Sequence, residues 1–533
     1  MKTRISLFLV ALFACRFMVA QVHISVSDPE TWSAQELLPY VGKTVIFDVP
    51  MVVCNNYGSA LTVSTRRMFS PTNQAIPLSN DYTSIVSLNA SGQIALSGVS
   101  TYHRCGEKIY NLKAKVNSAS SLTWVDGEFR GNTRADMNAG IPDVGDYRLL
   151  VCTMNLEYYL AKNTGSGGMG PSSYAEHQRQ RAKVNDALTH VNADIYGFVE
   201  IEQGQEAAEE IANDLNASLP GRNYTYINDG GSASGTYTKA AFVYDQNKVK
   251  TIGALQNNNT RLQNRKKMIC FEEIATGERF IFSVNHFKAK SGSGTGGDAD
   301  TGDGQGSFNA SRVEEAQSVV NQYKRYYAQI QEKDILIMGD LNAYAKEDPI
   351  RLFLDNGMID LHREFQADSS YSYQYHGYAG YLDHTISNGT LRPQVTGVSG
   401  YHINSDESDN YTYDKSNDQT MFRSSDHDPV LVGLKLDSTL TYDPSPTLNN
   451  YEVLTGQADE LIIRNAVSKG RAFYAIYTIN GILLQQKDIN GELVNQKEII
   501  SDMEHVTLPS TSGVYIIYIY SNGQVYQRRL IVR

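Results

Sequence analysis

The stretch ILIMGDLNAYAKEDP, residues 335–349, decides the fold of this chain. Its first four residues form an apolar run that predicts a buried strand, and turn-forming residues follow at 339–342. Because residues i and i+2 of an extended chain face the same side, the Asp340 carboxylate and the Asn342 amide can reach one water molecule or one phosphate oxygen. Taken alone, the pattern also fits an ordinary Gly-Asp turn after a core strand.

Five other stretches place polar side chains at or inside apolar, strand-like runs. They are LLVCTMNLE with Asn155, IYGFVEIEQ with Glu200, FIFSVNHFKAK with His286 and Lys288, GYLDHTIS with Asp383, and SSDHDPVLVGL with Asp426 and His427. Helical apolar spacing in HQRQRAKVNDALTHV and SRVEEAQSVVNQYKRYYAQI precedes two of the six strands, which indicates an alternating α/β arrangement. The repetition favours one shared site over six unrelated turns.

The order and spacing of these residues resemble the endonuclease/exonuclease/phosphatase superfamily, which has the DNase I-like fold. The resemblance covers roughly residues 147–436, and VNHFKAK, DTGDGQGSFNASR and YHINSDE are similar to stretches of secreted bacterial extracellular nucleases of that superfamily. It implies the fold class α/β, with a four-layer α/β-sandwich core over residues 145–436. An N-terminal all-β, OB-like domain and a C-terminal β-sandwich are expected to flank this core.

The resemblance also implies a metal site. Hydrolysis of a phosphodiester brings water to an anionic phosphorus, and a hard cation such as Mg²⁺, which prefers carboxylate, amide and water oxygens, neutralises the developing charge. By resemblance, Glu200 is the principal ligand, and Asn155 and Asp426 complete or orient its shell. Mn²⁺ is an alternative ion, and Ca²⁺ is an alternative as a structural or activating ion.

The remaining site residues are expected to orient the reactants and carry protons. The resemblance implies that Asp340 and Asn342 orient the attacking water and the scissile phosphate. It implies that His427 transfers a proton and that Asp383 fixes the tautomer of this histidine. His286, with Lys288 nearby, would stabilise the negative charge or protonate the leaving oxygen.

The overall charge gives no general attraction to nucleic acid. The net charge is −11 and the sequence pI is about 5.5, so phosphate neutralisation has to come from local cations. The candidates for substrate binding are Lys239, Arg265 and Lys288. The expected substrate is DNA rather than RNA.

The N-terminal residues predict export. Residues 1–20, MKTRISLFLVALFACRFMVA, have the pattern of a secretory signal peptide, and a lipoprotein signal acylated at Cys15 is the alternative. No other stretch reaches 18 apolar residues, so no transmembrane segment is expected. We expect a protein that is secreted or held at the outer-membrane surface of a Gram-negative bacterium.

Residues 21–138 contain short alternating or β-branched runs separated by Gly, Asn and Ser, which predicts an all-β unit. The unit looks OB-like, and binding of nucleic acid and a spacer role both stay open for it. Cys54 and Cys105 in this region could form a disulfide in an oxidising compartment. Buried free thiols are the expectation for Cys152 and Cys270.

The C-terminal part changes in character. Residues 437–450 form a polar linker with two prolines, and residues 451–533 return to short strands. The runs YAIYTINGILLQQ and SGVYIIYIYSNGQVYQRRLIVR resemble the C-terminal sorting domain of type IX secretion, which implies the secretion machinery as a partner. A carbohydrate- or surface-binding β-sandwich is the alternative.

One insertion inside the core stands apart. Residues 291–306, SGSGTGGDADTGDGQG, are rich in Gly and predict a loop. The acidic residues Asp298, Asp300 and Asp303 are spaced as in a calcium loop, but Asn309 stands where an EF-hand has its final Glu. A flexible acidic loop is therefore expected.

Together these patterns predict a secreted, metal-dependent, monomeric endonuclease that hydrolyses extracellular DNA, with RNA as the alternative substrate. One alternative is a phosphatase or phospholipid phosphodiesterase on the same scaffold, since this fold hosts several activities. A catalytically silent surface-binding protein is another. The intact set of Asp340, Asn342, Asp426 and His427 argues against a catalytically silent protein.

Overall fold

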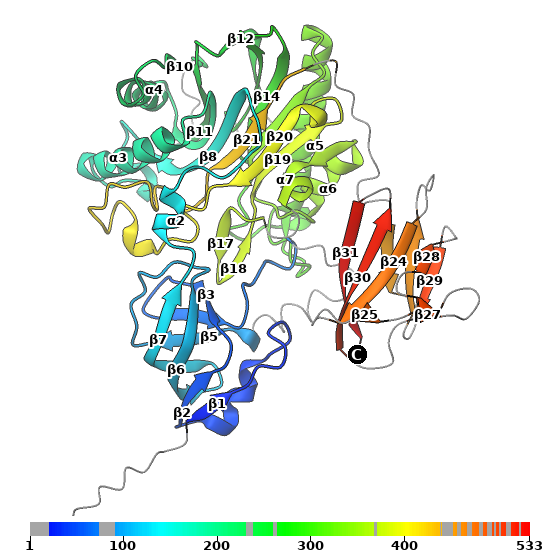
Figure 1. Ribbon diagram of the computed structural model, residues 1–533. Coiled ribbons are helices and arrows are strands. Elements are labelled where there is room, and N and C mark those ends of the chain that lie inside the picture. Colours follow the sequence, from blue (N-terminus) through cyan, green and yellow to red (C-terminus); the bar gives the residue numbers. More distant parts are fainter. Residues whose placement is uncertain are drawn as a thin grey trace, which may run out of the picture. The chain divides into compact units, whose positions relative to one another are not determined.

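The structure is a computed structural model that describes residues 21–73, 91–230, 238–258, 264–366, 370–437 and 439, and the strands of the C-terminal part (Figure 1). The chain divides into two compact units, one up to Tyr442 and one from Asp443 onward. The predicted signal peptide and nearly all of the predicted linker lie outside the described residues. In the described part, no helix combines the length and apolar character that a membrane crossing requires.

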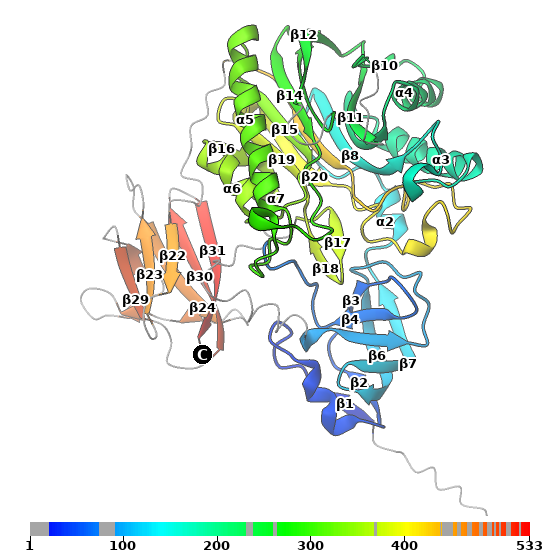
Figure 2. The same ribbon diagram turned by 180° about the vertical axis from the view of Figure 1, so that it is seen from behind.

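The N-terminal strands close into a barrel (Figure 2). The ring forms because β3 pairs with β4, β4 with β5, β5 with β7, β7 with β6 and β6 with β3, while β2 and β1 extend it beyond β6. The bounds are β1 (Val22–Ile24), β2 (Thr44–Phe47), β3 (Met51–Asn55), β4 (Leu61–Ser64), β5 (Ile94–Ser97), β6 (Lys108–Ser118) and β7 (Ser121–Arg130), with the 3-10 helix η1 at Ala34–Tyr40. Every second side chain along a strand points into the barrel, and these side chains fill it. Strand β6, for example, buries Leu112, Ala114 and Val116. The region is thus built mainly of strands, and its OB-like assignment stays a prediction.

The two cysteines of the barrel are separate thiols. Cys54 and Cys105 are both buried and free, and Cys105 Sγ donates a hydrogen bond to the Cys54 carbonyl oxygen over 3.3 Å. Burial raises the pKa of the Cys54 thiol to about 11. Both groups are therefore neutral side chains of the barrel core. Cys152 and Cys270 are also buried free thiols.

The central part contains two six-stranded mixed sheets. The first has the order β10-β11-β9-β8-β21-β20, and the second has the order β12-β13-β14-β15-β19-β16. The bounds of the first are β10 (Tyr224–Tyr226), β11 (Thr238–Asp245), β9 (Ile195–Glu202), β8 (Leu149–Tyr159), β21 (Val430–Leu434) and β20 (Val395–Gly400). Those of the second are β12 (Val249–Asn257), β13 (Lys266–Glu273), β14 (Arg279–Asn285), β15 (Ile335–Asp340), β19 (Asp383–Asn388) and β16 (Met358–Asp360). In each sheet the central pair is parallel, β8 with β9 and β14 with β15.

Apolar side chains join the two sheets face to face. Val151 and Phe242 of the first sheet and Phe282 and Leu336 of the second belong to one buried cluster. The approach is close at Gly197, where an added Cβ would lie 2.4 Å from Val284 Cγ2. Strands buried on both faces explain why these segments read as nearly continuous apolar runs.

Helices cover the two outer faces (Figures 1 and 2). Helices α3 (Tyr174–Val191) and α4 (Glu206–Ser218) share a buried cluster with the first sheet, and α5 (Asn309–Ile330) and α6 (Asp348–Asp355) share one with the second. In α3, Val184, Ala187, Leu188 and Val191 form the buried stripe at helical spacing. The order is helix, sheet, sheet, helix, which are the four layers predicted from the sequence.

Shorter elements lie around these layers. They are α2 (Arg134–Asn138), η2 (Ser166–Gly168), η3 (Gly296–Asp298), α7 (Leu361–Gln366), the hairpin β17 (Tyr373–Tyr375) and β18 (Tyr378–Gly380), η5 (Arg392–Gln394) and η6 (Asp409–Tyr411). The insertion 291–306 contains η3 and is otherwise irregular. Its Asp298 carboxylate accepts hydrogen bonds from Ser311 N and Oγ at the start of α5, over 2.8 and 2.6 Å.

The C-terminal unit is described by its strands. One sheet has the order β22-β23-β29, another has β25-β24-β30-β31 with β28 beside β24, and β26 pairs with β27. The bounds are β22 (Tyr451–Thr455), β23 (Glu460–Asn465), β24 (Ala472–Thr478), β25 (Leu483–Leu484), β26 (Gln486–Lys487), β27 (Leu493–Val494), β28 (Lys497–Ile499), β29 (Met503–Thr507), β30 (Gly513–Ser521) and β31 (Gln524–Val532). Ile476, Ile517 and Ile519 are buried. The sandwich and sorting-domain assignments stay predictions.

Candidate active site

Strand ends bring most of the predicted site residues together. Asn155 and Glu200 lie toward the ends of the parallel strands β8 and β9, and Asp340 ends β15. His286 directly follows β14, which runs parallel to β15, so both side chains reach the same edge of the second sheet. Asp383, at the start of the antiparallel strand β19, pairs in register with Asp340.

Asp340 lies at the centre of this cluster and is 2% exposed. Its Oδ2 accepts hydrogen bonds from the side-chain amides of Asn155 and Asn342, both over 3.2 Å, and its Oδ1 accepts the Asn342 backbone N–H over 2.9 Å. His286 Nε2 lies 3.5 Å and His427 Nε2 lies 4.0 Å from the same Oδ2. Four nitrogen atoms therefore surround one carboxylate oxygen.

His427 is oriented through its other ring nitrogen. Its Nδ1 lies 2.7 Å from Asp383 Oδ2, and Ser372 Oγ donates to the same oxygen over 2.6 Å. The ring of Tyr373 stacks on the imidazole with 4.5 Å between centroids. The carboxylate thus holds Nδ1, and Nε2 is left on the side of Asp340.

A second loop supports the segment that carries His427. Asn404 Nδ2 donates to the His427 carbonyl oxygen over 2.7 Å, and the backbone N–H groups of Asn404 and Ser405 donate to Asp428 Oδ1 over 2.9 and 2.8 Å. Asp428 is fully buried, so these bonds are not replaced by water. The position of His427 therefore depends on residues 404–405.

That supporting loop is attached to the barrel through Asp406. The Asp406 carboxylate is fully buried and accepts hydrogen bonds from Arg67 Nη2 (2.6 Å), Asn132 Nδ2 (2.7 Å), Tyr371 OH (2.8 Å) and Gln374 Nε2 (2.8 Å). Its backbone oxygen accepts from Asn56 Nδ2 over 2.9 Å. Three of these donors come from the N-terminal region, so that region helps to hold the active-site loops.

The predicted metal ligands have the chemistry of a hard-cation site. Glu200 Oε2 accepts the Tyr158 N–H over 3.2 Å, and Oε1 lies 3.6 Å from His286 Nε2. Burial, and next the negative charge of Asp426, raise the pKa of Glu200 to about 7. A third carboxylate, Glu157, has a buried Oε2 that finds no hydrogen-bond partner among the described residues.

Two mutually repelling carboxylates with an amide nearby fit Mg²⁺, which keeps several water ligands. In the described residues, no three His, Cys, Asp or Glu side chains are grouped tightly enough to hold a metal by themselves. Glu200 and Asp426, with Asn155, are the residues that would hold such an ion.

Burial and charge set the two histidines apart. Burial, followed by the charge of Arg265, lowers the pKa of His286 well below its usual value, so this ring is neutral near pH 7. Burial opposes the charged form of His427 as well. There the carboxylates of Asp383, Asp426 and Asp340 outweigh burial and raise the pKa of His427 well above its usual value. Burial also raises the pKa of Asp340, to about 6.

Backbone strain marks the same site. Glu200 has φ 56° inside β9, and Asn342 has φ 49° two residues after the end of β15. Non-glycine residues rarely adopt this conformation, and its energetic cost is typical of functional sites. At Gly339, with φ 118°, an added Cβ would lie 2.2 Å from the Asn285 carbonyl oxygen. Glycine at this position lets β15 end close beside the strand that leads into His286.

The three predicted substrate-binding cations differ in their surroundings. The charge of Arg265 acts on Glu200 and His286, which places its guanidinium near them, and its Nε has no hydrogen-bond partner within the described residues. Lys288 Nζ lies 4.2 Å from the centre of the Phe308 ring. Lys239 is 1% exposed, and its Nζ is bound to Asp229 Oδ2 over 3.0 Å. No described contact joins Lys239 to the cluster, and its role in substrate binding stays a prediction.

Ser372, Tyr373 and Asn404 are site residues that sequence reasoning missed. Ser372 and Tyr373 stand in the stretch SSYSYQYHGY, whose Ser and Tyr residues repeat without a motif. Asn404 falls within YHINSDE, a stretch that resembles secreted nucleases. That likeness was the one signal that pointed to it.

The comparison with protein families decides the classification. The model of the Endonuclease/Exonuclease/phosphatase family matches residues 160–427, which is half of the chain. The chain belongs to this family. Members of the family are hydrolases that act on phosphodiesters or phosphate esters, and they generally depend on a divalent metal ion. A search of curated proteins found no match.

Several solved structures resemble part of the chain. An endonuclease/exonuclease/phosphatase from Bacteroides vulgatus is 17% identical, covering 54% of this chain and 99% of its own, with a TM-score of 0.37. A mannosyl-6-phosphatase of Bacteroides thetaiotaomicron is 18% identical, with 54% and 100% covered and a TM-score of 0.37. The catalytic domain of human nocturnin is 14% identical, with 54% and 94% covered and a TM-score of 0.35. All three TM-scores are below 0.5, so nothing about substrate follows from these likenesses.

Proposed function

We propose that this chain is a secreted, divalent-metal-dependent endonuclease that hydrolyses phosphodiester bonds of DNA. The observation that carries the proposal is the pairing of His427 Nδ1 with Asp383 over 2.7 Å, beside an Asp340 carboxylate held by two amides. This arrangement suits hydrolysis because one group can position water while a neighbouring imidazole exchanges a proton.

The residues of the site divide the work by their charge and position. Asp340 Oδ2, fixed by the amides of Asn155 and Asn342, orients the attacking water at the phosphorus. His427, held in its charged form, gives its Nε2 proton to the leaving oxygen while Asp340 takes the proton of the attacking water, and the neutral His286 donates a hydrogen bond to a phosphate oxygen. A divalent cation held by Glu200 and Asp426 would supply neutralisation of the developing phosphate charge.

The choice of nucleic acid rests on the cations beside the site. Arg265 lies near Glu200 and His286, and Lys288 follows His286 by two residues. These charges offer local phosphate contacts in an acidic chain. Secretion, passage through a sorting machinery and a monomeric state belong to the same proposal, and the sequences of residues 1–20 and 451–533 support export.

A substrate panel tests the proposal. The purified protein is incubated with plasmid DNA, RNA, a sugar phosphate monoester and phospholipids, in Mg²⁺, Mn²⁺, Ca²⁺ or chelator. We expect nicking of plasmid DNA that requires a divalent ion and is lost in Glu200→Gln, which removes a ligand charge while keeping the side-chain shape. Turnover of the monoester or a phospholipid without any cleavage of nucleic acid would instead assign a phosphatase or phospholipid phosphodiesterase activity.

A further inference from the structure

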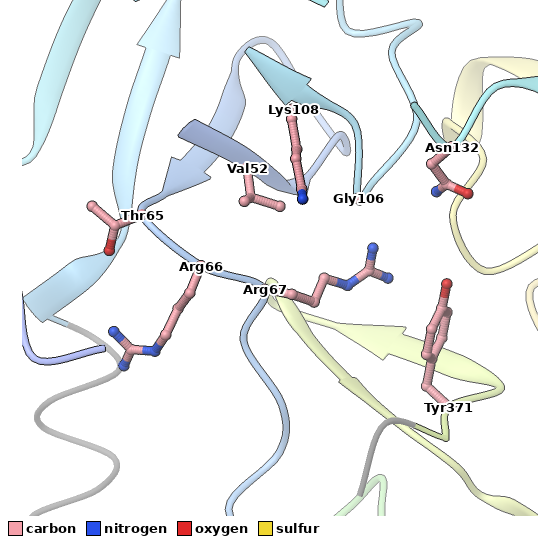
Figure 3. A pocket seen from close by; sticks show the side chains of 8 residues that line it. All are labelled: Val52, Thr65, Arg66, Arg67, Gly106, Lys108, Asn132 and Tyr371. Atoms are coloured by element: carbon pink, nitrogen blue, oxygen red, sulfur yellow. The ribbon is translucent and has the colours of Figure 1, made fainter. Parts of the chain in front are cut away.

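A basic pocket lies where the barrel meets the catalytic layers. It has a volume of about 440 Å³, and Thr65, Arg66, Arg67, Lys108, Asn132 and Tyr371 contribute to its wall (Figure 3). Three of the eight residues that line it are cationic, and none of the eight is acidic. In a chain with a net charge of −11, such a lining favours an anionic ligand.

The cations of the pocket differ in how far they are already neutralised. Arg67 Nη2 is bound to Asp406, but its Nε has no hydrogen-bond partner among the described residues. Arg66 Nη1 donates to the Pro29 carbonyl oxygen over 3.2 Å, and its Nε lies 3.6 Å from Glu30 Oε2. The exposed Lys108 Nζ has no ion-pair or hydrogen-bond partner in the described part of the chain. Among the described residues, Lys108 is therefore the lining cation that no carboxylate pairs.

The residues around Arg67 leave room for its guanidinium group and contact it. Gly106 has φ 90°, and an added Cβ there would lie 2.3 Å from Arg67 Nη1, so glycine makes room for the guanidinium. The Tyr371 ring lies 4.6 Å from Arg67 Cζ and stacks on His402 at 3.8 Å. Figure 3 shows Lys108 and Tyr371 pointing toward Arg67 from two sides, while Arg66 projects the other way.

A short segment joins this pocket to the catalytic histidine. Tyr371 lines the pocket, Ser372 donates to the Asp383 carboxylate over 2.6 Å, and Tyr373 stacks on His427 at 4.5 Å. The tyrosine that lines the pocket and the tyrosine that stacks on His427 are thus two residues apart in the chain. A strand bound at His427 that follows this segment would bring a nearby backbone phosphate toward the pocket.

We propose that this pocket binds a backbone phosphate of the nucleic-acid strand, a few nucleotides from the scissile bond. The proposal rests on the proposed function, because it names a second contact for the same substrate. The ligand class is a phosphodiester within a polymer rather than a free phosphate ion. The N-terminal barrel then contributes to substrate length preference as well as to the support of the loops.

The test compares charge changes on one strand of the barrel. Lys108→Gln and Lys108→Glu alter the pocket, while Lys115→Gln and Lys115→Glu change an exposed lysine of the same strand β6 outside it. Cleavage of an oligonucleotide of about 20 nucleotides and of bis(p-nitrophenyl) phosphate is measured for each protein. Oligonucleotide binding is followed by fluorescence anisotropy across a salt series, with chelator present.

We expect Lys108→Gln to weaken oligonucleotide binding several-fold and to reduce the slope of log K against log salt by about 0.7–0.9. Lys108→Glu should raise KM for the oligonucleotide about tenfold or more, with kcat/KM for the small diester unchanged. The two Lys115 variants should match the wild type. Inorganic phosphate should compete only weakly with the oligonucleotide.

Three outcomes would overturn the proposal. They are equal effects of the Lys108 and Lys115 variants, equal losses on the oligonucleotide and the small diester, and competition by inorganic phosphate as effective as that by the oligonucleotide. If wild-type protein cleaves DNA and Lys108→Glu does so with the same KM, the pocket fails while the proposed nuclease function stands. If wild-type protein neither binds nor cleaves nucleic acid, both fail.

Discussion

At the scale of single residues, the dyad of His427 and Asp383 carries the first prediction. His427→Ala and Asp383→Asn should each lower kcat about 100-fold or more, because one loses the proton carrier and the other loses the 2.7 Å bond that orients it. The double variant should be little worse than His427→Ala alone, since groups that act as a unit are not additive. Steady-state kinetics on one DNA substrate measure all three.

The control for this cycle is Ser372→Ala, which removes a donor to Asp383 Oδ2 but leaves the carboxylate on His427. It should cost less than tenfold in kcat. If the losses of the two dyad variants instead multiply in the double variant, Asp383 acts at another point of the reaction than His427.

At the scale of elements, the loop around Asp406 carries the second prediction. Charges of Arg67 and Arg104 outweigh burial and hold the pKa of Asp406 well below its usual value, so it is ionised at neutral pH. Asp406→Asn removes this charge and leaves buried arginines without it, a change that typically costs about 3–5 kcal/mol. We expect a fall of about 3 kcal/mol in the free energy of unfolding, measured in urea, and a lower kcat because residues 404–405 support His427.

The matched control is Asp409→Asn, three residues further along the same loop. Asp409 pairs at the surface with Lys415 over 2.8 Å, and such exposed pairs contribute about 0–1 kcal/mol. An Asp406→Asn protein as stable and as active as Asp409→Asn would show that the barrel does not hold the active-site loops.

The same elements show what the sequence can and cannot predict. The strands that carry Asn155, Glu200 and Asp340 were predicted because strands buried on both faces read as apolar runs. The role of Asp406 was not predicted, because its partner Asn56 is 350 residues away in the sequence and no local pattern records such a contact. The pairing of Lys239 with Asp229 was not predicted for a related reason. The sequence places this lysine in a strand but does not show which carboxylate it contacts.

At the scale of the whole molecule, buried histidines make stability depend on pH. Burial lowers the pKa of His384 to about 4, and its Nε2 lies 2.7 Å from the Ala343 carbonyl oxygen. In the unfolded chain a histidine has a pKa of about 6.5, so between pH 6.5 and 4 the unfolded state binds the proton first. The neutral His384 therefore favours the folded state above pH 6.5. This stabilisation is lost as the pH falls toward 4, and the free energy of unfolding drops by about 1.4 kcal/mol per pH unit.

His384→Gln should flatten that dependence. Glutamine keeps an N–H donor for the Ala343 carbonyl oxygen but does not titrate. Urea unfolding at several pH values between 8 and 5 should show the wild type losing about 1.4 kcal/mol per pH unit more than the variant below pH 6.5. The comparison isolates His384, because the active-site carboxylates contribute to both proteins alike. Parallel curves would show that His384 has the same pKa in the folded and the unfolded state.

The division of the chain at Tyr442 carries the last prediction. A chain of residues 21–442 should keep the kcat/KM and the Tm of the catalytic unit, because β21 is the last strand of the first sheet and the described site residues all precede it. A chain that ends at residue 429 is the control, and it should not fold, since it lacks the strand that pairs with both β8 and β20. A tenfold loss of kcat/KM in the 21–442 protein would show that the C-terminal unit takes part in catalysis.

If residues 443–533 are a sorting tag, cells that make the chain without them should accumulate it in the periplasm, and normal export would contradict that assignment.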